Sequence, residues 1–158
     1  MEKLKYNGYN PKLTIVSSSS KTIFKKIDFK YYKRNFKVKT YNFLEEKPLK
    51  NVLNNSTFGM ALYFFSEKNR KSNVMNGKVY FYLKHNLPVI TTNYCSFARD
   101  INKENLGFCS NNIDKIYNYI IGMNNKEFKK TKKNILNFLK KNKYELKIPK
   151  IIKQINTF

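Results

Sequence analysis

The spacing of apolar residues between positions 76 and 92 predicts a helix with one buried face. Val79, Tyr82 and Leu83 lie three and four residues apart, so their side chains can point in one direction from a helix. Asn86 follows at a position where helices end with a residue in the left-handed conformation. The pattern therefore predicts a helix that ends near residue 85 and turns at Asn86.

Two apolar runs flank this helix and lack its periodicity. Residues 58–65 are uninterrupted by charge, and the run 89–92 is rich in β-branched residues and follows Pro88. Both runs predict buried strands of a parallel sheet. The polar segment 66–77 would join the carboxyl end of the first strand to the helix. Together these elements form a βαβ crossover whose loop opens at the edge where α/β sheets bind ligands.

The rest of the chain repeats the alternation of short apolar runs and amphipathic stretches. The predicted strands are 13–16, 36–43 and 106–110. The predicted helices are a short one within 23–35 that is followed by an irregular segment, then 48–53, one capped by Ser96, 111–123, 125–142 and a short one after Pro149.

This alternation predicts a single α/β domain over residues 13–158, preceded by a tail or interdomain remnant at residues 1–12. We expect a Rossmann-like sheet of about five parallel strands with helices on both faces.

The chain is strongly basic, with a formal net charge of +22 over 158 residues. Most of the positive residues are lysines mixed with Asn, Ile, Tyr and Phe, which share A/T-rich codons, so part of the charge reflects genome composition. A field of this sign still attracts nucleotide diphosphates and anionic lipid. Nucleic acid and a peripheral contact with an anionic membrane are therefore both partners to consider.

Candidate metal and redox chemistry is sparse. Cys95 and Cys109 lack the CxxC spacing of a metal or redox site, and His85 is the one histidine. Apolar neighbours of both cysteines predict buried free thiols in a reducing compartment. No apolar run approaches the roughly 20 residues of a membrane span. These features predict a cytoplasmic protein without a metal site, with membrane association left open.

Three segments between residues 58 and 108 follow one another in a characteristic order. The residues that carry the pattern are Gly59, Ala61, Leu62 and Tyr63; then Asn76, Lys78, Tyr82, Leu83, Leu87, Pro88, Val89 and Ile90; then Glu104, Asn105, Leu106, Gly107 and Phe108. This arrangement resembles the C-terminal, nucleotide-sugar-binding half of GT-B fold glycosyltransferases.

The resemblance implies transfer of a sugar from a nucleotide sugar to a glycan or lipid-linked acceptor, with no bound metal or other cofactor. A two-domain enzyme of this kind is roughly twice as long as this chain, so the acceptor domain would be missing or separate. The chain departs from the family pattern at Phe81, where many members carry a Glu, and at Asn73, which stands near the first Glu of a paired-Glu motif.

Candidate donor-binding residues come from the strand-to-helix turns and from the resemblance. Lys68, Arg70 and Lys71 add positive charge near Lys78, as a diphosphate site requires, although a solvated loop has the same composition. The residues expected to bind the nucleotide sugar are Ser17, Ser18, Gly59, Asn73, Asn76, Gly77, Lys78, Tyr82, Tyr94 and Ser96.

Three functions remain open from the sequence. The first is the donor-binding domain of a glycosyltransferase. The second is a domain that has lost catalysis, as Phe81 and Asn73 allow, and binds a nucleotide or another protein. The third, ranked last, is nucleic-acid binding, in which aromatic residues such as Tyr31 and Phe36 between lysines stack on bases.

Overall fold

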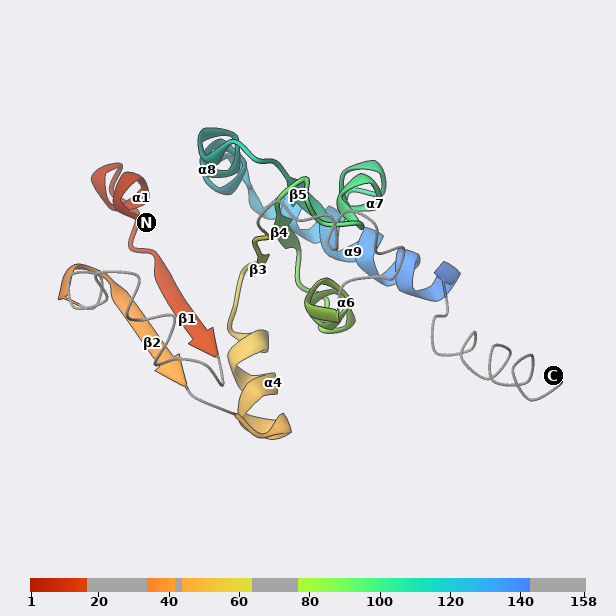
Figure 1. The fold of residues 1–158 in the computed structure, drawn as a ribbon, viewed down its shortest axis with the longest axis horizontal. Helices are drawn as coiled ribbons and strands as arrows, with labels where there is room; N and C mark the ends of the chain where they lie inside the picture. The colour runs from red at the N-terminus through yellow and green to blue at the C-terminus, as the bar shows by residue number, and fades with distance from the viewer. Residues whose placement is uncertain (17–33, 42–43, 64–76, 143–158) are drawn as a thin grey trace, which may run out of the picture. The chain divides into compact units, whose positions relative to one another are not determined.

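The computed structural model describes residues 1–16, 34–41, 44–63 and 77–142 (Figure 1). The chain forms two compact units, Met1–Asn55 and Ser56–Phe158, and each is described by itself. Both contain helices and parallel strands, so the predicted α/β class is confirmed. The helices expected over most of 23–35 and after Pro149 lie outside the described residues. No helix in the described ranges has both the length and the apolar composition that crossing a bilayer requires.

The first unit contains two parallel strands and two helices. Strands β1 (Lys12–Val16) and β2 (Lys37–Tyr41) pair along their whole length. Helix α1 (Glu2–Tyr6) lies within the segment 1–12 that the sequence predicts as a tail. Helix α4 (Glu46–Asn54) begins two residues before Pro48, which therefore stands in the first turn, where a missing N–H group is tolerated.

The second unit contains a three-stranded parallel sheet in the order β3-β4-β5. Its elements are β3 (Gly59–Ala61), α6 (Gly77–Lys84), β4 (Val89–Thr91), α7 (Ala98–Lys103), β5 (Gly107–Cys109), α8 (Ile113–Gly122) and α9 (Asn125–Asn142).

The predicted βαβ crossover is confirmed, because β3 and β4 are parallel and helix α6 lies between them in the chain. Val79 and Leu83 of this helix are fully buried, and Tyr82 is half-buried, as their spacing predicts.

The strands of the described residues do not form the single sheet of about five that the pattern predicts. The described strands form one sheet of two and one of three, and each strand pairs only with strands of its own unit. Hydrophobic runs identify strands, but pairing partners depend on contacts between segments that are distant in the chain.

Helices cover both faces of the three-stranded sheet. Register places Ala61, Thr91 and Cys109 on one face, with Ile90 and Phe108 on the other. The first face joins the main apolar core, which is completed by Val79, Leu83, Val89, Cys95, Phe97, Ile101, Leu106, Ile135 and Phe138.

On the other face, the Tyr119 ring of α8 stacks on Phe108, with the ring centroids 4.7 Å apart. Helix α9 buries Ile135 and Phe138 and exposes six lysines.

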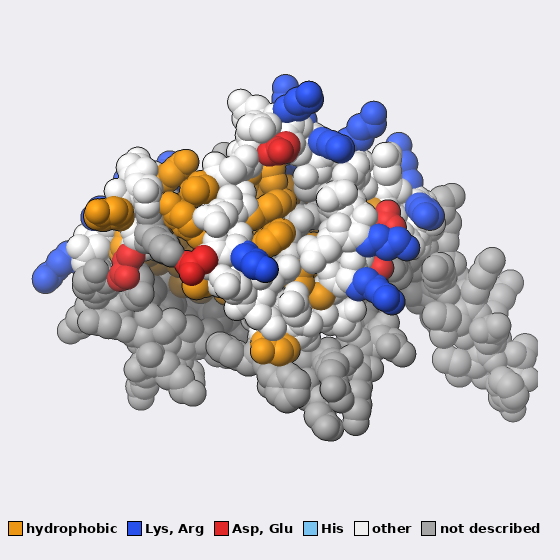
Figure 2. Space-filling model, turned by 90° about the horizontal axis from the view of Figure 1, so that it is seen from above, with side chains coloured by type: hydrophobic (Ala, Val, Ile, Leu, Met, Phe, Trp, Pro, Cys, Tyr) orange, Lys and Arg blue, Asp and Glu red, His pale blue; other side chains and the backbone are white. Residues whose placement is uncertain are grey.

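Lys and Arg side chains are scattered over the face shown in Figure 2, with few acidic residues among them.

Two helices end in the same left-handed turn before the strand that follows. After α6, the Asn86 N–H group donates to the Leu83 carbonyl oxygen at 2.8 Å and Leu87 N–H donates to Tyr82 O at 3.0 Å. Asn86 has a φ of 55°, and Asn105 after α7 has a φ of 49°. These are Schellman motifs, with asparagine at the position that glycine usually occupies. The predicted left-handed turn at Asn86 is confirmed.

Replacing Asn86 with glycine is expected to stabilise the protein by about 1 kcal/mol. Among the described residues, Asn86 Oδ1 is buried without a hydrogen-bond partner, and glycine would remove that atom as well as the left-handed strain. Asn86→Ala also removes the oxygen but retains a Cβ, so it should be about 1 kcal/mol less stable than Asn86→Gly. Urea unfolding of both variants measures the difference, and equal stabilities would contradict the role assigned to the left-handed backbone.

Candidate ligand-binding edge

The ends of the three parallel strands gather polar residues along one edge of the sheet. Ala61, Thr91 and Cys109 are in register, so the segments that leave them start side by side. We call these segments, residues 62–63, 92–96 and 110–112, the carboxyl edge. In open α/β sheets, ligands bind outside this edge.

Two threonines extend the pairing of β3 and β4 beyond the strands. The buried Thr91 hydroxyl donates to the Ala61 carbonyl oxygen at 2.6 Å. Thr92 Oγ1 accepts from Tyr63 N–H at 3.0 Å and its hydroxyl donates to Tyr63 O at 2.7 Å. These bonds hold the backbone at the point where the chain leaves β3.

A second set of side-chain bonds joins the exits of β4 and β5. Asn93 N–H donates to Asn111 Oδ1 at 2.8 Å, and the Cys109 thiol donates to Asn93 Oδ1 at 3.0 Å. Asn112 caps α8 by accepting from the N–H groups of Asp114 and Lys115. Sequence reasoning missed Asn93 and Asn111, although an asparagine directly after each of two adjacent predicted strands was a usable signal.

Two titratable groups at or directly beside this edge, Tyr63 and Cys109, have raised pKa values. Burial raises the pKa of the Tyr63 phenol, with Cys95 and Tyr82 close by adding to the effect. Burial also raises the pKa of the Cys109 thiol to about 12, with a smaller contribution from Cys95. Both cysteines are buried free thiols, as predicted. Tyr63 and Cys109 are therefore suited to hydrogen bonding rather than to the role of general base.

Helix α6 runs against the direction of the strands. Tyr82, near the carboxyl end of α6, packs on Gly59 at the start of β3. Val79, one turn closer to the amino end of α6, joins the core with Ala61 at the end of β3. The amino end of α6, with the predicted residues Gly77 and Lys78 exposed, is therefore directed toward the carboxyl edge. A Cβ at Gly77 would meet nothing within 4 Å, so packing does not require glycine there.

The predicted residues Gly59 and Tyr82 lie against each other. A Cβ on Gly59 would overlap Cγ of the Tyr82 ring and lie 2.6 Å from Cδ1. The Tyr82 hydroxyl donates to the Met60 carbonyl oxygen at 3.3 Å. The structure thus gives both residues a packing role at the first residue of β3, the end away from the carboxyl edge.

Tyr94 and Ser96 both lie on the carboxyl edge and are half-buried. The prediction that Ser96 caps the next helix is wrong, because the N-cap of α7 is Phe97 and makes no side-chain cap bond. Two successive turns, closed by Cys95 N–H to Thr92 O and Ala98 N–H to Cys95 O, delay the start of the helix. The remaining candidates, Ser17, Ser18, Asn73 and Asn76, lie outside the described residues.

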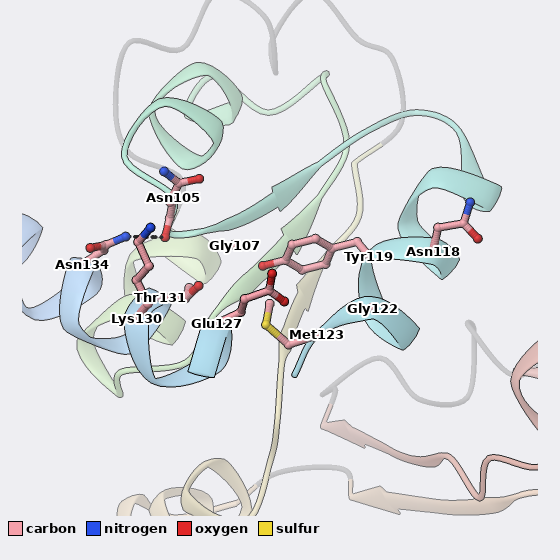
Figure 3. Close-up of a pocket in the computed structure, with 10 residues that line it drawn as sticks. All are labelled: Asn105, Gly107, Asn118, Tyr119, Gly122, Met123, Glu127, Lys130, Thr131 and Asn134. Atoms are coloured by element: carbon pink, nitrogen blue, oxygen red, sulfur yellow. Dashed lines mark hydrogen bonds between the residues drawn. The ribbon is translucent and has the colours of Figure 1, made fainter. Parts of the chain in front are cut away.

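A cavity of about 380 Å³ lies at the opposite end of this sheet. Figure 3 shows Tyr119 of α8 and Glu127 of α9 directed into it, close to Gly107 at the start of β5. Asn134 Nδ2 donates to Asn105 O at 3.5 Å on its rim. Because Gly107 marks the amino end of β5, this cavity is separate from the carboxyl edge. Within the described ranges, no three His, Cys, Asp or Glu side chains gather as a metal site requires.

Comparison with known proteins identifies one family. The family model described as "Glucosyltransferase 3-like, C-terminal domain" matches residues 10–154, which is most of the chain. No curated protein and no solved structure matches the sequence.

Proposed function

The chain belongs to the family of glucosyltransferase 3-like C-terminal domains, and from this membership we propose that it binds the nucleotide-sugar donor of a glycosyltransferase. The family match over residues 10–154 is the observation that carries the proposal. Under it, the three-stranded unit is part of the Rossmann-like donor half of a GT-B enzyme. The parallel β3-β4-β5 sheet, with its polar carboxyl edge, supports this assignment.

The proposed donor site combines the carboxyl edge with the amino end of α6. Backbone N–H groups and the dipole at a helix amino end favour an anion, and Lys78 adds a positive charge there. This end would hold the diphosphate and stabilise the negative charge that grows as it leaves the sugar. Tyr94 and Ser96, on the same edge, would hydrogen-bond the ribose or the sugar.

The proposal assigns acceptor binding and the general base to another domain. The Tyr63 phenol and the Cys109 thiol, whose pKa values burial raises, do not suit proton abstraction near neutral pH. The acceptor would be a glycan or a lipid-linked glycan, and transfer would need neither a bound metal nor another cofactor. Two buried free thiols favour a reducing compartment, so we place the activity in the cytoplasm.

A titration of the 158-residue chain with UDP-glucose, UDP and GDP, followed by amide NMR, tests the proposal. We expect shifts at the carboxyl edge and at Gly77 and Lys78. Lys78→Ala should weaken binding about tenfold, because it removes one charge-assisted phosphate contact. The matched control is Lys84→Ala, which removes the same charge from the other end of α6.

Three outcomes of this titration contradict the proposal. Equal losses in Lys78→Ala and Lys84→Ala would mean that overall charge, rather than a phosphate site at the helix end, attracts the nucleotide. Shifts confined to the cavity beside Tyr119 would move the site to the other end of the sheet. Binding of a single-stranded oligonucleotide that falls steeply with salt, with no response to nucleotides, would favour a nucleic-acid-binding domain.

A second candidate, nucleotide binding without catalysis, is favoured by Phe81. This residue replaces the Glu that many GT-B enzymes carry, and its ring packs edge-on against His85 with the centroids 4.8 Å apart. A domain of this kind would bind the donor as above but support no sugar transfer. Assay with an added acceptor domain separates the two functions, since only an active domain would release UDP.

A further inference from the structure

A hollow of about 400 Å³ lies in the first unit at the amino ends of its two strands. It is formed by the end of α1, the segment leading into β1 and the segment leading into β2. The described residues that line it are Lys5, Tyr9, Asn10, Pro11, Arg34, Asn35, Phe36 and Lys37. Its volume falls in the range of small-molecule sites, roughly 300–1,000 Å³.

The described walls of this hollow carry positive charge. Lys5, Arg34 and Lys37 contribute three cations, and none of its described lining residues is Asp or Glu. Cations held around one concave surface raise the local concentration of anions. Asn10 and Asn35 add amide groups that can donate hydrogen bonds to an oxyanion.

Local backbone structure holds the wall formed by the end of α1 in place. Helix α1 ends in a Schellman motif, with Tyr9 N–H donating to Leu4 O at 3.0 Å and Gly8 N–H to Lys5 O at 3.0 Å. Gly8 has a φ of 80°, which glycine adopts without strain. This turn places Tyr9 on the rim of the hollow, where its side chain is 47% exposed.

Lys5 is anchored to the opposite wall. Its Nζ donates to the Asn35 carbonyl oxygen at 3.0 Å and lies 5.5 Å from the centroid of the Phe36 ring. An ammonium group carries three donors, and the bond to Asn35 uses one of them. These contacts already hold the Lys5 side chain in one conformation. A ligand that binds Lys5 therefore pays a smaller entropy cost for ordering it.

We propose that this hollow is a binding site for a phosphorylated small molecule. The planar guanidinium group of Arg34 would donate hydrogen bonds to two phosphate oxygens. Lys5 and Lys37 would each donate one charge-assisted hydrogen bond to the phosphate. Tyr9 offers a ring against which a sugar attached to the phosphate can pack. The site uses none of the residues of the carboxyl edge, so it is additional to the proposed donor site.

The test compares inorganic phosphate, glucose 1-phosphate and neutral glucose by calorimetry and amide NMR on the full chain. We expect both phosphates to shift residues 5–10 and 34–37, with glucose 1-phosphate binding more tightly because of Tyr9, and glucose alone to cause no shift. Equal binding by the two phosphates would mean that the site takes free phosphate and would refute the role of Tyr9. Binding of neutral glucose at the same residues would overturn the proposal.

Two variants separate a built site from general attraction by a basic protein. Arg34→Ala and Lys37→Ala should each weaken phosphate binding about tenfold. The control Lys126→Ala removes the same charge from an exposed position on α9 and should change binding less than twofold. Equal losses in all three variants, or no binding of either phosphate at millimolar concentration, would refute the site. Circular dichroism shows whether each variant folds. If Arg34→Ala does not fold, the result for Lys37→Ala tests the site.

Discussion

Replacing Gly107 with alanine is expected to cost at least about 3 kcal/mol of folding free energy and to prevent the second unit from folding normally. A Cβ at this position would overlap the carbonyl oxygen of Val89 and lie 2.5 Å from its backbone nitrogen. Gly107 also has a φ of 154°, which side chains rarely adopt. The obstacle is the backbone of the central strand β4, so no change of rotamer can relieve it.

The control for this prediction is Gly122→Ala at the end of α8. A Cβ at Gly122 would meet nothing within 4 Å, and alanine favours a helix over glycine by up to about 1 kcal/mol. Urea unfolding should therefore find Gly122→Ala at least as stable as the parent protein. If Gly107→Ala matched the parent in stability, the close approach of β5 to β4 would be incorrect.

Gly59→Ala is expected to destabilise the second unit by about 2–3 kcal/mol. The added Cβ would overlap Cγ of the Tyr82 ring and lie 2.6 Å from Cδ1. The whole ring would have to leave its position against Gly59 to make room for the methyl group. Moving the ring would also break the hydrogen bond from the Tyr82 hydroxyl to Met60 O.

A double-mutant cycle isolates this contact. In a Tyr82→Ala background the ring is absent, so Gly59→Ala should cost less than about 1 kcal/mol, with a coupling energy above about 1 kcal/mol. Gly77→Ala serves as the control, because a Cβ there has open space around it. The same cost for Gly59→Ala in both backgrounds would show that the strain comes from elsewhere than Tyr82.

The candidate site was predictable only where local signals pointed to it. Lys78 follows the expected start of a helix, and the structure places it at the exposed amino end of α6. Gly59 and Tyr82 matched the family pattern, but the structure shows them packed together. Asn93 and Asn111 were missed although each directly follows a predicted strand, because the bond between them forms only when the two strands pair.

The order and type of the described elements from β1 to α9 follow from the sequence by itself, whereas helix α1 was not predicted. The periodicity of α6, the left-handed turn at Asn86 and the buried run of β4 are local properties, set by side-chain spacing and backbone sterics. Tertiary structure alone decided which strands pair, why Gly107 and Gly59 must be glycines, and which cations surround the hollow beside Tyr9. Each of these depends on atoms that are far apart in the chain and meet only when it folds.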